Sequence, residues 1–384
     1  MGTAHQGQPQ SPPLTSRNFL ANIGPNWFAS VMGTGIVAIA SARLPVEIVG
    51  LRAFAQGVWV IAAVLLVFLV VVVGGHWLRH PTVARSHARN PQMTHFYGAA
   101  PMALVTVGSG ALTVGKDLIG VDLAVDVAWV LWTAGTIGGL FTAVTIPFLM
   151  FTQLDVEPDA PFGGWLMPVV PPMVSAVGGA LLMPYIGGVT ARATMLYGCY
   201  AMFGLSLLAS FNIIAMIWSR LALFGTSGSA RVPTLWIVLG PIGQSITAAG
   251  LLGSAAVGTV PPDLATGLSV FGIVYGVVAW GFAVLWIALA TALTVTTLRR
   301  GMPFALSWWS LTFPVGTFVT GTTQLALHTH LPAFTVAAVI AYVGLVFTWI
   351  LVAVRTARGS VQGTLLTTPP STAPVKAGKN LGRR

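Results

Sequence analysis

Hydroxyl and amide side chains recur in apolar segments that carry little else that is polar. They follow helical spacing in five segments: Ser30, Thr34 and Ser41; Thr106, Ser109 and Thr113; Ser175; Gln244, Ser245 and Thr247; and Thr317, Thr320 and Gln324. In a pore, such uncharged groups replace part of an ion's hydration shell without trapping the ion. Between membrane helices they form interhelical hydrogen bonds instead. The stripes therefore predict either a pore lining or helix–helix contacts.

The same segments lack the side chains that proton coupling, catalysis or metal binding needs. No Lys, Arg, Asp, Glu or His falls in the middle of one, whereas proton-coupled pumps usually keep an ionisable residue at depth. No H-E-x-x-H, G-x-S-x-G or Walker A pattern occurs. One cysteine, Cys199, excludes a disulfide framework and a cysteine zinc cluster. We therefore expect no catalytic residue, no metal site and no cofactor, and we predict that the protein is not an enzyme.

Composition identifies the class of protein. Of 384 residues, 18 are basic and 8 are acidic, so 7% are charged, while 55% are hydrophobic. Soluble domains carry about 25% charged residues, which they need to cover their surface. The few basic residues also exclude a nucleic-acid partner, despite the net charge of +10. The composition indicates a polytopic membrane protein, and hence the lipid bilayer as a partner.

The apolar segments predict an all-α fold, because a bilayer core of about 30 Å needs about 20 helical residues per crossing. We predict two disordered tails, residues 1–22 and a basic tail at 357–384, around a transmembrane domain at 23–356. Ten helices are expected in that domain, at about residues 24–42, 51–77, 95–114, 123–151, 163–183, 194–218, 233–253, 266–296, 306–327 and 332–354.

Basic residues set the expected orientation. With both termini in the cytoplasm, the outside receives only Arg43, Arg52, Lys116 and Arg192. The other 14 of the 18 basic residues then lie inside, which satisfies the positive-inside rule. The sequence predicts a multi-pass protein with cytoplasmic termini, and its short, simple tails favour a bacterial inner (plasma) membrane.

Prolines mark a repeat of about 70 residues. Pro101, Pro171, Pro241 and Pro314 lie 70, 70 and 73 residues apart, each in an odd-numbered predicted helix. Proline interrupts helical hydrogen bonding, which membranes tolerate where the backbone borders a cavity or other protein. The repeat predicts five helical hairpins in a pseudo-fivefold ring, with the proline helices around a central pore and the longer helices facing lipid.

Three motifs resemble the tellurite-resistance/dicarboxylate transporter family. They are NWFASVMGTGIV at 26–37, NPQ at 90–92 and WWSLTFPVGT at 308–317. This family includes plant slow-type anion channels, the bacterial tellurite-resistance protein, and fungal malate permeases and sulfite efflux pumps. The resemblance implies a ten-helix pore and a homotrimer. It also implies that a phenylalanine before the ninth-helix proline, here Phe313, plugs the pore.

Together these arguments predict an anion channel or transporter for sulfite, a related oxyanion or a C4-dicarboxylate such as malate. Helix breaks in the ring would aim backbone dipoles at the pore and favour anions. The alternatives are a proton-coupled dicarboxylate uptake carrier, an intramembrane enzyme or a structural membrane subunit. The candidate gate is Phe313, and the candidate pore lining and helix breaks are Ser30, Thr34, Pro101, Thr106, Ser109, Pro171, Ser175, Pro241, Ser245, Pro314, Thr317 and Thr320.

Overall fold

The computed structural model describes residues 23–226 and 228–365, and this part of the chain is helical throughout, without a β-strand. Seven helical segments in it are long and apolar enough to cross a membrane. The fold is therefore that of an all-α, multi-pass membrane protein. Both predicted tails lie largely outside the described residues. The last helix nevertheless runs to Val361, so the tail expected from residue 357 begins inside it.

A short 3₁₀ segment precedes a largely buried α-helix five times in the described chain. The pairs are η1 (Pro25–Trp27) with α2 (Phe28–Arg43), η2 (Thr94–Gly98) with α5 (Ala99–Gly110), η4 (Gly163–Leu166) with α8 (Pro171–Leu182), η6 (Val232–Val238) with α10 (Leu239–Ala256), and η7 (Leu306–Leu311) with α12 (Phe313–Thr329). We call α2, α5, α8, α10 and α12 the inner helices.

A long helix follows each of these pairs. The long helices are α3 (Leu51–Arg79), α7 (Val121–Thr152), α9 (Val189–Phe224), α11 (Pro262–Arg299) and α13 (Pro332–Val361). Short elements connect the rest: α4 (Pro81–Arg89), the π-helix η3 (Ala111–Gly115), α6 (Lys116–Ile119) and η5 (Met183–Tyr185).

The inner helices contact one another in a closed cycle. Helix α2 packs on α5, α5 on α8, α8 on α10, α10 on α12, and α12 on α2. The 3₁₀ segments form a second cycle in the same order, η1–η2–η4–η6–η7–η1, so all five inner helices begin at one end of the molecule. This parallel arrangement gathers their N-termini together.

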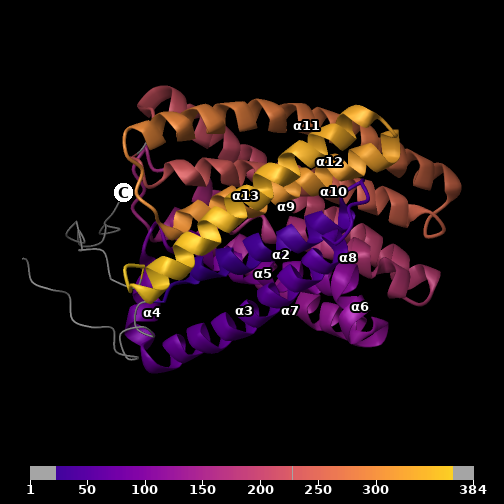
Figure 1. The fold of residues 1–384 in the computed structure, drawn as a ribbon, viewed down its shortest axis with the longest axis horizontal. Helices are drawn as coiled ribbons and strands as arrows, with labels where there is room; N and C mark the ends of the chain where they lie inside the picture. Colours follow the sequence, from indigo (N-terminus) through magenta and orange to yellow (C-terminus); the bar gives the residue numbers. More distant parts are fainter. Residues whose placement is uncertain (1–22, 227, 366–384) are drawn as a thin grey trace, which may run out of the picture.

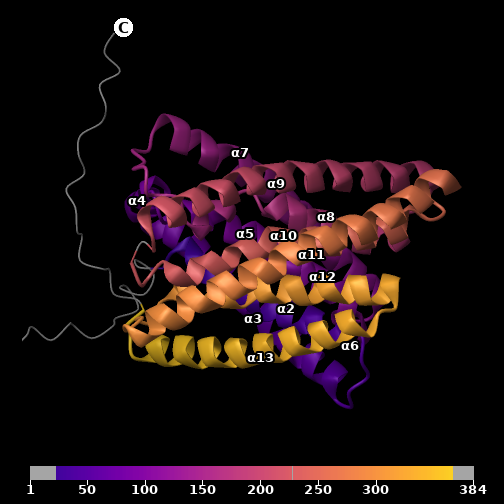
Figure 2. The same ribbon diagram turned by 90° about the horizontal axis from the view of Figure 1, so that it is seen from above.

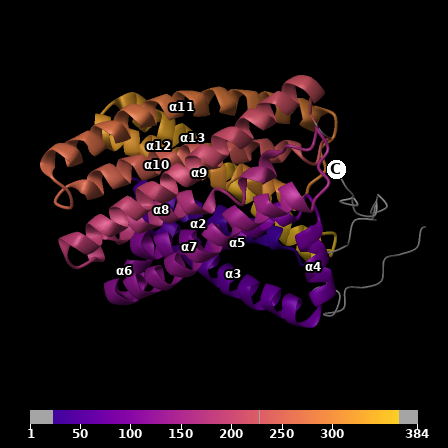
Figure 3. The same ribbon diagram turned by 180° about the vertical axis from the view of Figure 1, so that it is seen from behind.

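The long helices enclose the inner ones. Helix α13 crosses the front of Figure 1, α11 and α3 run along opposite edges, and α9 lies at the back, as Figure 3 shows. Seen from above in Figure 2, α13 and α9 lie on opposite sides of the inner helices. The most apolar windows of the long helices are only 22–33% buried, whereas those of Thr94–Ile119 and Val232–Ala256 are 83% and 89% buried. The long helices therefore present the apolar outer surface.

The four repeat prolines lie in the first turn of an inner helix rather than within one. Pro171 begins α8, Pro314 is the second residue of α12, and Pro101 and Pro241 are the third residues of α5 and α10. First-turn N–H groups have no partner within the helix, so proline costs no hydrogen bond there. All four prolines are buried. The irregular backbone is the 3₁₀ segment before each helix, so the expectation that these prolines interrupt the helices from within was wrong.

Helices α2, α8 and α12 are not among the seven long segments because they are short. These helices have 16, 12 and 17 residues, and 17 residues span about 26 Å at 1.5 Å per residue. A helix shielded by others does not have to cover the bilayer core alone, because protein rather than lipid surrounds its ends.

Candidate functional site

Two cavities lie between the inner helices. The N-end cavity lies among the N-terminal parts of these helices and is lined by Ala29, Met32, Phe96, Met102, Met167, Val170, Ile237, Gly240, Pro241, Leu306, Trp309, Ser310, Phe313 and Pro314. The C-end cavity lies further along the same helices and is lined by Ile36, Ile39, Arg43, Thr106, Ser109, Val174, Val177, Leu181, Gln244, Thr247, Leu251, Phe313 and Thr320.

Among the described residues, Phe313 alone lines both cavities. It begins α12 directly before Pro314, and its side chain is only 3% exposed. Each cavity has a volume of about 20 Å³, which is room for about one water molecule. A buried aromatic side chain therefore borders two narrow spaces.

The N-end cavity collects the first turns of the inner helices. Ala29 lies in the first turn of α2, Val170 directly precedes α8, Gly240 follows the first residue of α10, and Phe313 begins α12. Each helix N-terminus carries a partial positive charge of roughly half a proton from its aligned peptide dipoles. The walls thus supply positive potential, although the described residues that line this cavity include no charged side chain.

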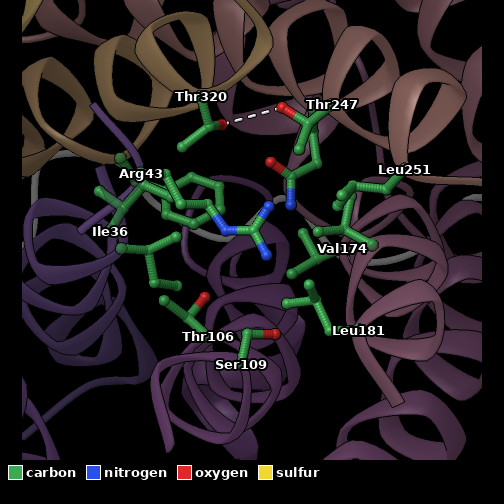
Figure 4. Close-up of a pocket in the computed structure, with 13 residues that line it drawn as sticks. Ile36, Arg43, Thr106, Ser109, Val174, Leu181, Thr247, Leu251 and Thr320 are labelled. Carbon is green, nitrogen blue, oxygen red and sulfur yellow. Dashed lines mark hydrogen bonds between the residues drawn. The ribbon is translucent and has the colours of Figure 1, made fainter. Parts of the chain in front are cut away.

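The C-end cavity combines hydroxyls, one amide and one cation. Figure 4 shows the guanidinium of Arg43 between the hydroxyls of Thr106 and Ser109 on one side and those of Thr247 and Thr320 on the other. The two threonine hydroxyls of the latter pair lie 2.9 Å apart and share a hydrogen bond. The Arg43 guanidinium and the Ser109 hydroxyl can donate a hydrogen bond to an anion, whereas the hydroxyls of Thr106, Thr247 and Thr320 also bond to carbonyl oxygens of their own helices.

Two groups in the C-end cavity lack a partner. Among the described residues, no hydrogen bond or ion pair joins the Arg43 guanidinium to another group. Gln244 is 3% exposed, and its Oε1 has no hydrogen-bond partner in the described structure. Buried polar groups are normally paired because leaving them unpaired costs free energy. The cavity is therefore equipped for a polar occupant.

Five of the twelve sequence-predicted lining residues border a cavity. Thr106, Ser109 and Thr320 line the C-end cavity, and Pro241 and Pro314 line the N-end cavity. The candidate gate Phe313 joins them, as described above.

The other seven candidates contact neighbouring helices or turns. Thr34 accepts a hydrogen bond from Trp349, Ser245 accepts one from Tyr275, and Thr317 donates to the carbonyl oxygen of Leu239. Ser30 donates within its own turn to Trp27. The remaining three are buried, Pro101 beside Gly138, Pro171 beside Gly139, and Ser175, whose carbonyl oxygen accepts from Trp132.

Sequence analysis missed Arg43 as a cavity residue, because it was counted only as an outer-side charge. Gln244 and Thr247 were seen in a polar stripe but not selected as lining residues. The position of Arg43 could have indicated its role. Arg43 is the last residue of the inner helix α2 and lies one turn beyond Ile39, which lines the same cavity.

Comparison with known proteins gives a consistent result. The chain is 26% identical to the sulfite efflux pump SSU1 of Arthroderma otae over 339 residues, which cover 87% of this chain and 89% of that protein. It is 28% identical over 306 residues to an uncharacterized transporter of Methanocaldococcus jannaschii, covering 79% of this chain and 83% of the relative. Residues 22–357 match the family described as voltage-dependent anion channel. The chain therefore belongs to the SLAC1 family of voltage-dependent anion channels.

Proposed function

We propose that this protein conducts small anions through a path along the axis of the inner helices. The path runs from the N-end cavity past Phe313 to the C-end cavity. The observation that carries the proposal is the convergence of inner-helix N-termini on the N-end cavity, because their dipoles attract anions. The position of Phe313 between the cavities supports its role as the gate, since a bulky apolar ring blocks hydrated ions.

We further propose that ten helices cross the membrane as five hairpins with pseudo-fivefold symmetry. Support comes from the five alternations of 3₁₀-plus-inner helix with a long helix, and from the closed cycle of inner-helix contacts. In this arrangement α2, α8 and α12 are crossings that protein rather than lipid surrounds.

The proposed substrate is sulfite or a related small oxyanion, with a C4-dicarboxylate as the second candidate. The names of the SSU1 relatives, sulfite efflux pumps, support the first choice. A proton-coupled carrier is less well supported, because no Asp, Glu or His is among the described residues that line the cavities. The same lining offers no catalytic pair for an intramembrane enzyme.

Flux into proteoliposomes tests this function. We expect the purified Phe313→Ala protein to accelerate the uptake of sulfite and chloride above that of protein-free vesicles, with potassium permeability unchanged. Malate should enter more slowly than sulfite if the oxyanion assignment holds. Vesicles that take up no anion faster than the empty control, or that admit potassium equally well, would contradict an anion channel.

We also propose that the protein lies in a bacterial plasma membrane with both termini in the cytoplasm. Cysteine labelling tests the orientation cleanly, because Cys199 is the one cysteine of the chain and is buried. In a Cys199→Ala background, Ser86→Cys next to Arg85 and Thr190→Cys near Arg192 are both at exposed positions. A membrane-impermeant maleimide applied to intact cells should label only Thr190→Cys. Labelling of both, or of Ser86→Cys alone, would refute the topology.

A further inference from the structure

The C-terminal half of the proposed path raises an electrostatic problem. The parallel inner helices that present positive N-termini to one cavity present their C-terminal ends, with partial negative charge, at the opposite end. Leu181, which lines the C-end cavity, lies directly before the last residue of α8, whereas the helix that holds Ser109 continues through η3 and α6 to Ile119. An anion that has passed Phe313 therefore moves towards a repulsive potential, which a fixed positive charge would offset.

Arg43 is that charge. Among the described residues that line the two cavities, it is the only charged side chain. A role as a helix cap is not seen, because no hydrogen bond connects its guanidinium to a carbonyl oxygen at the end of α2 or to any other described group. An arginine that is partly withdrawn from water without a partner is costly, and an anion is the occupant that removes this cost.

The surrounding groups complete a donor set. The hydroxyls of Ser109, Thr247 and Thr320 line the same cavity, and Gln244 adds an amide that can donate through its NH₂ group. Thr247 and Thr320 bond to each other and to carbonyl oxygens of their own helices, so each would exchange one of these bonds for a bond to an anion. The Gln244 Oε1 has no partner in the described structure, so no hydrogen bond to that oxygen fixes the orientation of the amide. A guanidinium with neutral donors around it matches an oxyanion, whose oxygens accept a bidentate pair of hydrogen bonds.

We infer that Arg43, Ser109, Gln244, Thr247 and Thr320 form a binding site for one small oxyanion on the C-terminal side of Phe313, and that Arg43 determines the preference for oxyanions over chloride. This inference rests on the proposed function and specifies its substrate class. Apart from Thr106 and Phe313, the rest of the described lining is aliphatic, and it holds no second cation, so the second carboxylate of a C4-dicarboxylate would be desolvated without a charged partner. The site therefore favours sulfite-like anions over malate.

Flux measurements with arginine variants test the inference. In proteoliposomes of the Phe313→Ala protein, adding Arg43→Gln should lower sulfite flux about tenfold or more, because hydrogen bonds to charged groups are the strong ones. Arg43→Lys should keep most of the chloride flux but lower the sulfite-to-chloride ratio, because lysine retains the charge and loses the bidentate geometry. The matched control is Arg52→Gln, which removes an exposed arginine that pairs with Asp117 outside both cavities. It should change neither flux.

A binding measurement separates this inference from the proposed function. In detergent, sulfite should raise the unfolding temperature of the unsubstituted protein and of the Arg52→Gln variant, because a ligand that binds the folded state stabilises it. Sulfite should not raise the unfolding temperature of the Arg43→Gln variant. If vesicles with the Phe313→Ala protein take up no anion while sulfite still stabilises the protein in an Arg43-dependent way, the proposed conduction path is contradicted and the oxyanion site is supported. If folded Arg43→Gln matches Arg52→Gln in sulfite flux and in stabilisation by sulfite, the inference is overturned.

Discussion

Replacing Phe313 with alanine is expected to raise anion flux at least about tenfold. A barrier lowered by only about 1.4 kcal/mol gives a tenfold rate, and removing the ring joins two cavities that it now separates. The expected cost in stability is about 3–5 kcal/mol at most, by comparison with buried phenylalanines in soluble cores. Flux of sulfite or chloride into proteoliposomes, at matched amounts of inserted protein, measures the effect.

Phe318→Ala is the matched control for this experiment. Phe318 lies on the same helix, is 4% exposed and lines neither cavity, because its ring stacks on Trp280 with 6.2 Å between centroids. Its truncation should destabilise the protein without opening the path. If Phe313→Ala loses stability to a similar degree and gains no flux, then Phe313 is a packing residue and the gate does not exist.

Replacing Gly243 with alanine is expected to destabilise the ring of inner helices by about 1–3 kcal/mol, the usual cost of overpacking. A Cβ on Gly243 would lie 2.5 Å from the backbone nitrogen of Phe318 and 2.5 Å from the carbonyl carbon of Thr317. Backbone atoms cannot rotate away, so α12 would have to move away from α10. This movement would occur near the first turn of α12, which holds Phe313. Thermal unfolding in detergent should show a lower midpoint than for the unsubstituted protein.

Gly240→Ala provides the control on the same helix. Gly240 is also buried, but apart from its chain neighbours and the adjacent backbone of α10, no atom lies within 4 Å of the position its Cβ would take. Alanine also has a higher helix propensity than glycine, so this variant should be as stable as the parent or slightly more stable. Equal midpoints for the two variants would show that the close approach of α10 and α12 is not required.

The alternation of inner and outer helices could be predicted from the sequence because it depends on periodic signals. The prolines at 101, 171, 241 and 314 identified the segments that lie inside, and the charge-free apolar runs identified the long helices. The role expected for the prolines was wrong, because their spacing cannot distinguish a proline that kinks a helix from one in its first turn. That distinction depends on the 3₁₀ segment before each helix, which has no comparable periodic signal.

The candidate site was harder to predict because helical spacing shows which residues share one face of a helix. It does not show whether that face packs against another helix or borders a cavity. Thr34 and Ser245 share the stripe pattern of Thr320, yet an indole NH or a tyrosine OH from a long helix bonds to each of them. Arg43 shows the converse: its backbone ends α2 where an exterior charge was expected, while its side chain lines the cavity. Side-chain direction at a helix end is decided by tertiary packing, which local sequence does not specify.

The reversal potential of the Phe313→Ala protein in a planar bilayer tests the central claim most directly. With a potassium sulfite gradient across the membrane, an anion-selective path lined by helix N-termini and Arg43 predicts a reversal potential that approaches the value set by the sulfite gradient. Adding Arg43→Gln should move that potential towards zero. A reversal potential that follows the potassium gradient, or currents no larger than those of the bilayer alone, would contradict an anion pore through these cavities.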